Sequence, residues 1–312
     1  MRYLIFFAAL ALLMSVGVSW PKSKNFSESD FFFFAAPAAT ERDEAPDDPF
    51  KNLELQAQAA VLLDLSKGEL IFKKNEDLEW PLASLTKLVT AAVFYEHKED
   101  FFKDDWPQIP LTAEAVSQEG DDGFLVGESF AAEDLVRVML VKSSNDAAYA
   151  LADWLKKYAD SNDPSWFVNE MNLFVSRLGF QKTYFLNPAG LDADSHLAGA
   201  YSSASEVADL FSWLIKNRPQ IILATAKPQI TVYSSRGRKH IFESTAKAAM
   251  GIPGLSGVKT GYTDLARGNI VMSFGIGMER QFIAVVLGSS YEGRFSDALK
   301  LYEAALKYVE KL

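Results

Sequence analysis

Strand-like hydrophobic runs occur at both ends of the chain beyond about residue 50, and a long stretch with a helical pattern separates them. Residues 59–65 form an almost continuous apolar run, and residues 69–73 follow after the turn at 66–68, so these two runs are predicted to pair as a hairpin. The late strands are predicted at 257–262, 269–274 and 281–287. One sheet assembled from both ends of the chain is therefore expected.

In the middle of the chain, apolar residues recur at the spacing of an α-helix. A helix is predicted to begin near Ser84, where the apolar positions within 85–93 share one face and Ser84 and Lys87 lie one turn apart. Further helices are predicted at 133–141, 146–157, 167–178 and 203–215. A closing helix should start at Arg294. These elements predict an α+β fold in which a mostly helical lobe lies beside the sheet.

The first fifty residues differ in character from the rest. Residues 1–20 have a basic start at Arg2 and then an almost unbroken apolar run, which is typical of either a cleaved signal peptide or a retained N-terminal membrane anchor. Residues 21–50 are predicted to be a flexible linker. Its four phenylalanines, 31–34, are either a sticky patch or a contact with a membrane interface. Residues 51–312 should form the folded domain, located outside the cytoplasm.

Composition excludes several classes of function. The net charge of −10 provides no basic field for nucleic acid. Cysteine is absent, which removes disulfides, thiolate catalysis and cysteine-ligated zinc. The three histidines, His97, His196 and His240, lack the spacing of a metal site. The sequence therefore predicts no metal and no cofactor.

Three short motifs occur in order: Ser84-Leu85-Thr86-Lys87, Ser143-Ser144-Asn145 and Lys259-Thr260-Gly261. The first pattern, Ser-x-x-Lys, also occurs at 19–22, 244–247 and 256–259. Only the copy at Ser84 opens an amphipathic helix soon after a hairpin, so context favours that copy.

Together these residue types predict serine acyl transfer. A serine hydroxyl needs a base, and Lys87, one turn from Ser84, can serve if its amine is neutral. Burial and a nearby cation both favour a neutral amine, and Lys259 is expected to supply that cation. Ser143 is a candidate for relaying the proton to the leaving amine, and Asn145 for binding a substrate amide.

The third motif is expected to bind the substrate. Lys259 and Thr260 are candidates for holding a terminal carboxylate, and Gly261 leaves room for an extended peptide to lie along its strand. The backbone N–H groups of Ser84 and Tyr262 are expected to form an oxyanion hole.

With these motifs the sequence resembles the low-molecular-mass penicillin-binding proteins, the serine-type D-alanyl-D-alanine carboxypeptidases, from about Leu55 to its end. The stretches at 81–88, 143–148, 167–172, 187–192, 201–204 and 257–261 all resemble segments of that family. The resemblance implies the penicillin-binding and β-lactamase-like transpeptidase fold, an antiparallel sheet flanked by helices. It also implies a peptidoglycan stem peptide ending in D-Ala-D-Ala as substrate, and β-lactam antibiotics as covalent inhibitors.

The sequence departs from the family pattern in three places. The family often has histidine where this chain has Tyr262, and an arginine on a late strand whose nearest match here is Arg280. Many relatives also carry a further β-rich domain at the C-terminal end, and this sequence stops soon after the closing helix.

Two alternative functions are a β-lactamase of related fold and a non-catalytic cell-wall-binding protein. The β-lactamase segment Glu-x-x-Leu-Asn is approached only at 170–174, without its final asparagine. Ser84 and Lys87, both present, argue against a loss of turnover.

Overall fold

The computed structural model describes residues 48–101 and 106–312, which belong to one compact unit. The predicted leader at 1–20 and nearly all of the predicted linker at 21–50 lie outside the described residues. Among the helices that are described, none is both long and apolar enough to cross a bilayer.

A five-stranded antiparallel sheet joins the two ends of the described chain, as the hydrophobic pattern predicts. Its strand order is β10-β11-β12-β1-β2, so β12, from the C-terminal region, pairs with β1. The strands are β1 (Ala59–Asp64), β2 (Glu69–Lys74), β10 (Leu255–Thr263), β11 (Arg267–Ile276) and β12 (Arg280–Ser289). All six residues of β1 are buried, because helices cover both faces of the sheet here.

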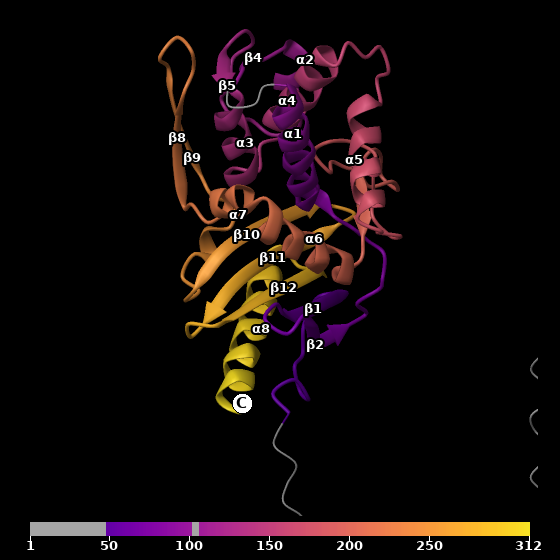
Figure 1. Cartoon of the computed structure of the whole chain (residues 1–312), viewed down its shortest axis with the longest axis vertical. Helices are drawn as coiled ribbons and strands as arrows, with labels where there is room; N and C mark the ends of the chain where they lie inside the picture. The colour runs from indigo at the N-terminus through magenta and orange to yellow at the C-terminus, as the bar shows by residue number, and fades with distance from the viewer. Residues whose placement is uncertain (1–47, 102–105) are drawn as a thin grey trace, which may run out of the picture. The chain divides into compact units, whose positions relative to one another are not determined.

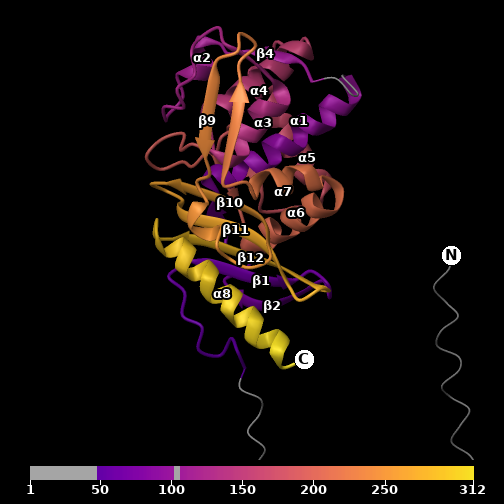
Figure 2. The same ribbon diagram turned by 90° about the vertical axis from the view of Figure 1, so that its left-hand side faces the viewer.

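Each face of the sheet packs against its own layer of helices (Figures 1 and 2). On one face lies α8 (Gly293–Glu310), and on the other lie α6 (Ala204–Asn217) and α7 (Pro219–Thr225). Successive side chains of a strand point to opposite faces. Accordingly Phe282 and Ala284 of β12 pack in the cluster with α8, whereas Ile283 packs in the cluster that continues into the helical lobe.

The helical lobe is built around α1 (Lys87–Phe101), and in Figure 1 it occupies the upper part of the molecule. The residues of α1 from Lys87 to Phe94 are all buried, as expected for a central helix with neighbours on every side. The helices around it are α2 (Ala113–Val116), α3 (Ala132–Val141), α4 (Asn145–Tyr158) and α5 (Trp166–Arg177). The long helices predicted from the sequence are thus confirmed.

The prediction of a mostly helical middle was incomplete. The structure adds α7, the 3₁₀ helix η2 (Lys247–Ala249) and a hairpin of β8 (Gln229–Tyr233) and β9 (Lys239–Glu243). It also adds five strands of two or three residues: β3 (Trp80–Pro81), β4 (Gln108–Pro110), β5 (Ser129–Ala131), β6 (Tyr184–Phe185) and β7 (Ala200–Ser202). Such short strands contain too few residues to show a hydrophobic period.

Asp297 holds three parts of the structure together from the first turns of α8. It is fully buried, and its carboxylate accepts hydrogen bonds from the backbone N–H groups of Gln56 (3.1 Å) and Ala57 (2.9 Å) and from the hydroxyl of Ser289 (2.8 Å). The segment before β1, the end of β12 and α8 therefore meet at one carboxylate.

We expect Asp297→Ala to lower the free energy of unfolding by about 3 kcal/mol, because it leaves buried donors without an acceptor. Denaturant unfolding measures this change. The matched control is Glu303→Ala on the exposed side of the same helix, which should change stability by no more than about 0.5 kcal/mol. Equal effects of the two substitutions would contradict the role given to Asp297.

Candidate active site

Ser84 lies where the sheet meets the helical lobe. It belongs to the 3₁₀ helix η1 (Ala83–Thr86), which leads directly into α1 and packs against β10. A Cβ atom on Gly261 of β10 would lie 3.0 Å from the backbone nitrogen of Ser84 and 2.8 Å from the carbonyl oxygen of Leu82. Glycine at 261 therefore allows the strand to approach the serine segment closely.

The Lys87 amine is fully buried and surrounded by three oxygen atoms. Its Nζ lies 2.8 Å from Ser84 Oγ, 2.7 Å from Asn145 Oδ1 and 2.8 Å from the carbonyl oxygen of Ala189. A neutral amine has two N–H donors and one lone pair. The amide and carbonyl oxygens can only accept, so they take the two N–H groups, and the lone pair is left for the hydroxyl of Ser84.

Burial changes the charge state of this lysine. It lowers the pKa of the Lys87 amine to about 7, and the negative charge of Asp122 acts in the opposite direction. A lysine with a pKa near neutrality is a competent proton acceptor, because a large share of it is uncharged at physiological pH.

The loop 187–191 provides one of the three oxygens around Lys87. Asn187 Oδ1 accepts hydrogen bonds from the backbone N–H groups of Ala189 (3.2 Å), Gly190 (2.7 Å) and Leu191 (3.2 Å), which folds the loop tightly. Gly190 has a φ of +78°, and a Cβ atom there would lie 2.0 Å from the carbonyl oxygen of Ala83. The Asn-Pro-Ala-Gly sequence thus places the Ala189 carbonyl against the amine.

The second motif faces the third across the cleft. The ammonium of Lys259 is 1% exposed and donates to Ser143 Oγ (2.7 Å) and to the carbonyl oxygen of Thr260 (2.9 Å). Ser143 has a φ of +66°, a left-handed conformation that is rare outside glycine and is often found at functional sites.

The structure adds contacts to two residues whose roles were expected from the sequence. Lys259 was expected to be the cation that keeps Lys87 neutral, but its own pKa is lowered well below the usual value, first by burial and then by the charges of Lys87 and Arg294. Asn145 was expected to bind a substrate amide, and its second Nδ2 N–H, which has no partner among the described residues, keeps that role a prediction. Its Oδ1 accepts from Lys87, and its Nδ2 donates to the carbonyl oxygen of Glu119 (2.6 Å).

Arg294, at the start of α8, places in the cleft a cation that the sequence analysis did not single out. Its guanidinium is 3% exposed, lines the cleft and donates to the carbonyl oxygen of Gly261 (2.9 Å). A positive side chain in the first turn opposes the helix dipole, and this mismatch is the one local signal that could have singled it out.

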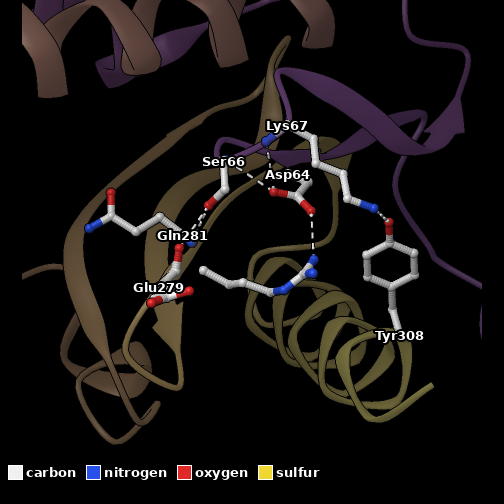
Figure 3. Close-up of polar contacts among 7 residues, drawn as sticks. Asp64, Ser66, Lys67, Glu279, Gln281 and Tyr308 are labelled. Atoms are coloured by element: carbon white, nitrogen blue, oxygen red, sulfur yellow. Dashed lines mark hydrogen bonds and ion pairs between the residues drawn. The ribbon is translucent and has the colours of Figure 1, made fainter. Parts of the chain in front are cut away.

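Arg280 is the first residue of β12 and lies away from the cleft, whereas Arg294 comes after the last residue of that strand and lines the cleft. Its guanidinium pairs with Asp64 at 3.3 Å. Figure 3 shows the surroundings of that carboxylate, where Asp64 also accepts from the backbone of Ser66 and Lys67, and Lys67 contacts Tyr308. The expected role of Arg280 in carboxylate binding was wrong, because the strand direction carries it away from Gly261.

The cleft has a volume of about 250 Å³, and its walls differ in charge. One wall is formed by the third motif and Arg294, and the facing wall includes an acidic loop at 119–122. Tyr262 and Tyr291 form an edge-to-face pair at 5.2 Å on the same cleft. The lining residues comprise Ser84, Glu119, Gly120, Asp121, Asp122, Lys142, Ser143, Asn145, Thr245, Thr260, Gly261, Tyr262, Tyr291 and Arg294.

The acidic loop also raises the pKa of Asp146, a buried residue near the start of α4. Burial raises the pKa of Asp146 to about 7, and the charges of Asp122 and Asp121 raise it further. Both aspartates thus act on Asp146, whereas of the two only Asp122 raises the pKa of Lys87.

Glu170, from the segment closest to the β-lactamase pattern, lies on α5 and pairs with His97 at 3.1 Å. It is not among the residues that line the cleft. Within the described part of the chain, no three histidine, aspartate or glutamate side chains are grouped as they would be around a metal ion.

Comparison with known proteins assigns this arrangement to a class. A model of the D-alanyl-D-alanine carboxypeptidase family matches residues 42–291. The carboxypeptidase DacF of Bacillus subtilis is 30% identical over 236 residues, which cover 75% of this chain and 58% of that protein. DacA of Escherichia coli is 31% identical over 267 residues, covering 82% of this chain and 62% of that protein. The chain thus spans about 60% of the length of these curated relatives.

The fold has solved counterparts. A penicillin-binding protein from Listeria monocytogenes, in its ampicillin-bound form, is 33% identical, with a TM-score of 0.66 over 82% of this chain and 99% of that one. The fold of the chain is thus similar to that of a penicillin-binding protein. More narrowly, the chain belongs to the D-alanyl-D-alanine carboxypeptidase family.

We expect Asp122→Asn to lower the pKa of Lys87 below about 7, because it removes the negative charge that favours the ammonium. The base must be neutral to act, so the acid limb of the acylation rate should move to lower pH, and the ratio of the rate at pH 6 to that at pH 8 should increase. The matched control is Asp121→Asn, which should leave that ratio unchanged. An equal shift for both variants would contradict the assignment of this limb to Lys87.

Proposed function

We propose that the chain is a serine D-alanyl-D-alanine carboxypeptidase that cleaves peptidoglycan stem peptides through an acyl-enzyme on Ser84. The observation that carries this proposal is the position of the buried Lys87 amine, 2.8 Å from Ser84 Oγ, with its N–H groups taken by two other oxygens. This arrangement favours a serine hydroxyl that donates its proton to lysine. Membership of the carboxypeptidase family supports the choice of substrate.

In the acylation step, Ser84 Oγ attacks the carbonyl carbon of the D-Ala-D-Ala peptide bond and its proton passes to Lys87 Nζ. The oxygen that becomes negative is placed between the backbone N–H groups of Ser84 and Tyr262, as the proximity of β10 to η1 permits. The peptide bond then breaks, and the proton held by Lys87 passes by way of the Ser143 hydroxyl to the leaving amine of the terminal D-alanine, which leaves Lys87 neutral again. Water, deprotonated by Lys87, hydrolyses the resulting ester and frees Ser84.

The cationic wall of the cleft is suited to a substrate that ends in a carboxylate. Thr260 offers a hydroxyl and Arg294 a guanidinium, which stays protonated even where burial lowers its pKa. Lys259 acts mainly through Ser143, to which it donates a hydrogen bond. Asn145 positions Lys87 and the acidic loop, and its second Nδ2 N–H can donate to a carbonyl oxygen of the substrate.

A penicillin should acylate the same serine. Its amide and neighbouring carboxylate have the same relation as the last peptide bond and carboxylate of the substrate. The opened ring stays attached, so it obstructs the path of water, and the adduct should be long-lived. Glu170, the carboxylate nearest to the β-lactamase pattern in sequence, is paired with His97 outside the cleft, which favours a carboxypeptidase over a β-lactamase.

This chemistry belongs outside the cytoplasm, where peptidoglycan lies, and residues 1–20 have the sequence of an export signal or an N-terminal anchor. Residues 51–312 are the proposed catalytic domain. No cofactor is required, because serine, lysine and water supply every proton and bond in the scheme.

We expect Ser84→Ala to abolish release of D-alanine and covalent labelling by penicillin, a loss of about 10⁴-fold or more, while the domain stays folded. Mass spectrometry after incubation with penicillin, beside a D-alanine assay on a D-Ala-D-Ala peptide, makes the measurement. Labelling that persists in the variant would overturn the choice of nucleophile. In the wild-type protein, rapid turnover of penicillin without peptide cleavage would indicate a β-lactamase, and neither reaction would indicate a binding protein.

Lys87→Arg should lower the acylation rate by about 10²–10⁴-fold, because a guanidinium cannot lose its proton and so cannot act as a base. Lys259→Arg is the matched comparison and should be milder, since arginine still donates a hydrogen bond towards Ser143 and keeps a positive charge. Stopped-flow labelling with a chromogenic β-lactam measures both rates. Equal losses would contradict this division of roles.

A further inference from the structure

One hydroxyl in the cleft has no part in the proposed mechanism. Thr245 lies in the loop after β9, outside the three motifs, and its Oγ1 is 2.8 Å from Oγ1 of Thr260. Both side chains line the cleft. Among the described residues, neither hydroxyl has a second hydrogen-bond partner. The pair therefore stands at the wall where the substrate carboxylate is expected.

Thr245 belongs to 244–247, one of the additional Ser-x-x-Lys matches in the sequence, and the structure gives that segment a different use. Ser244 is buried and its Oγ accepts from the backbone N–H of Ala246 (3.1 Å). Lys247 lies at the surface, 3.3 Å from Glu243. The backbone N–H of Thr245 donates to the carbonyl oxygen of Val141 (3.1 Å), which fixes the segment to the end of α3. The segment thus holds one threonine in the cleft.

The number of protons in the pair limits what it can do. Each hydroxyl has one proton and two lone pairs, and the bond between the two oxygens uses one proton. One proton is left over, and a carboxylate can only accept. The hydroxyl that receives the internal hydrogen bond is the one that can donate to the substrate.

We propose that Thr245 is a positioning residue that donates its hydroxyl proton to Thr260 and thereby directs the Thr260 proton to the terminal carboxylate of the substrate. Accepting one hydrogen bond also strengthens the bond that Thr260 donates, since hydrogen bonds in a chain polarise one another. This inference rests on the proposed function, and it extends the carboxylate site beyond the third motif to the loop after β9.

The direction of the internal bond follows from the position of the two residues. Thr260 is 3% exposed and adjacent to Lys259 and Gly261, at the centre of the cationic wall. Thr245 is exposed at the edge of the cleft. The proton that meets the carboxylate should therefore be the one on the central hydroxyl, with Thr245 as the outer donor that fixes its orientation.

The test is Thr245→Val, which keeps the shape of the side chain and the backbone bond to Val141 but removes the hydroxyl. We expect KM for a D-Ala-D-Ala peptide to rise about five- to tenfold with a smaller change in kcat, the loss typical of one hydrogen bond between uncharged groups. Thr245→Ser should restore most of the loss. Thr231→Val, on the exposed side of β8, is the matched control and should behave as wild type.

Two further measurements separate positioning from a purely structural effect. Acylation by a penicillin should slow in Thr245→Val, whereas acylation by its methyl ester, which has no free carboxylate, should be equal in the variant and the wild type. In a Thr260→Val background, Thr245→Val should have no additional effect, because its acceptor is absent.

Additive effects of the two valine substitutions, or an equal slowing with the methyl ester, would overturn the positioning role. An unchanged KM in Thr245→Val would overturn it as well. These outcomes are distinct from failure of the proposed function, in which the wild-type protein itself would neither cleave the peptide nor be labelled.

Discussion

The structure depends on the burial of one lysine amine among three oxygens. Lys87 is fully buried, and a charged amine in such a place would be costly, so burial lowers its pKa to about 7. The cost of burial is limited because the Lys87 amine donates two hydrogen bonds. One goes to the Asn145 side chain on α4, and the other goes to the Ala189 carbonyl oxygen in the 187–191 loop. Those two acceptors leave the lone pair for Ser84. Stability of the site and reactivity of the serine thus follow from the same contacts.

The sheet provides the fixed surface against which this group is held. β10 runs beside η1 at a distance that only glycine at 261 permits, and Arg294 binds the carbonyl oxygen of that glycine from α8. Asp297, one turn further along α8, ties the helix to the segment before β1 and to the end of β12, two neighbouring strands of the sheet. The C-terminal helix therefore fixes the strand that faces Ser84 as well as supplying a cation to the cleft.

In the proposed function, the difference in charge between the two walls of the cleft orients the peptide substrate. The cationic wall, with Thr260 and Arg294, suits the terminal carboxylate, while the loop at 119–122 places carboxylates on the other side. The loop is coupled to the chemistry through Asp122, which acts on Lys87, and through the Glu119 carbonyl, which holds Asn145. A substitution of Asp122 in this loop should therefore change the pKa of Lys87, even though the loop contributes no catalytic group.

By itself, the sequence determined the order of the long elements and the serine, lysine and glycine motifs. Buried strands, amphipathic helices and short motifs are local patterns, and their residues are neighbours along the chain. The sequence also favoured the Ser-x-x-Lys copy whose serine lines the cleft, because the start of a helix is a local signal. Only the tertiary structure decided which arginine enters the cleft, what Asn145 contacts and why Thr245 lies there. These depend on pairings between segments far apart in sequence, such as β12 with β1 and the loop after β9 with β10, whose geometry no local pattern specifies.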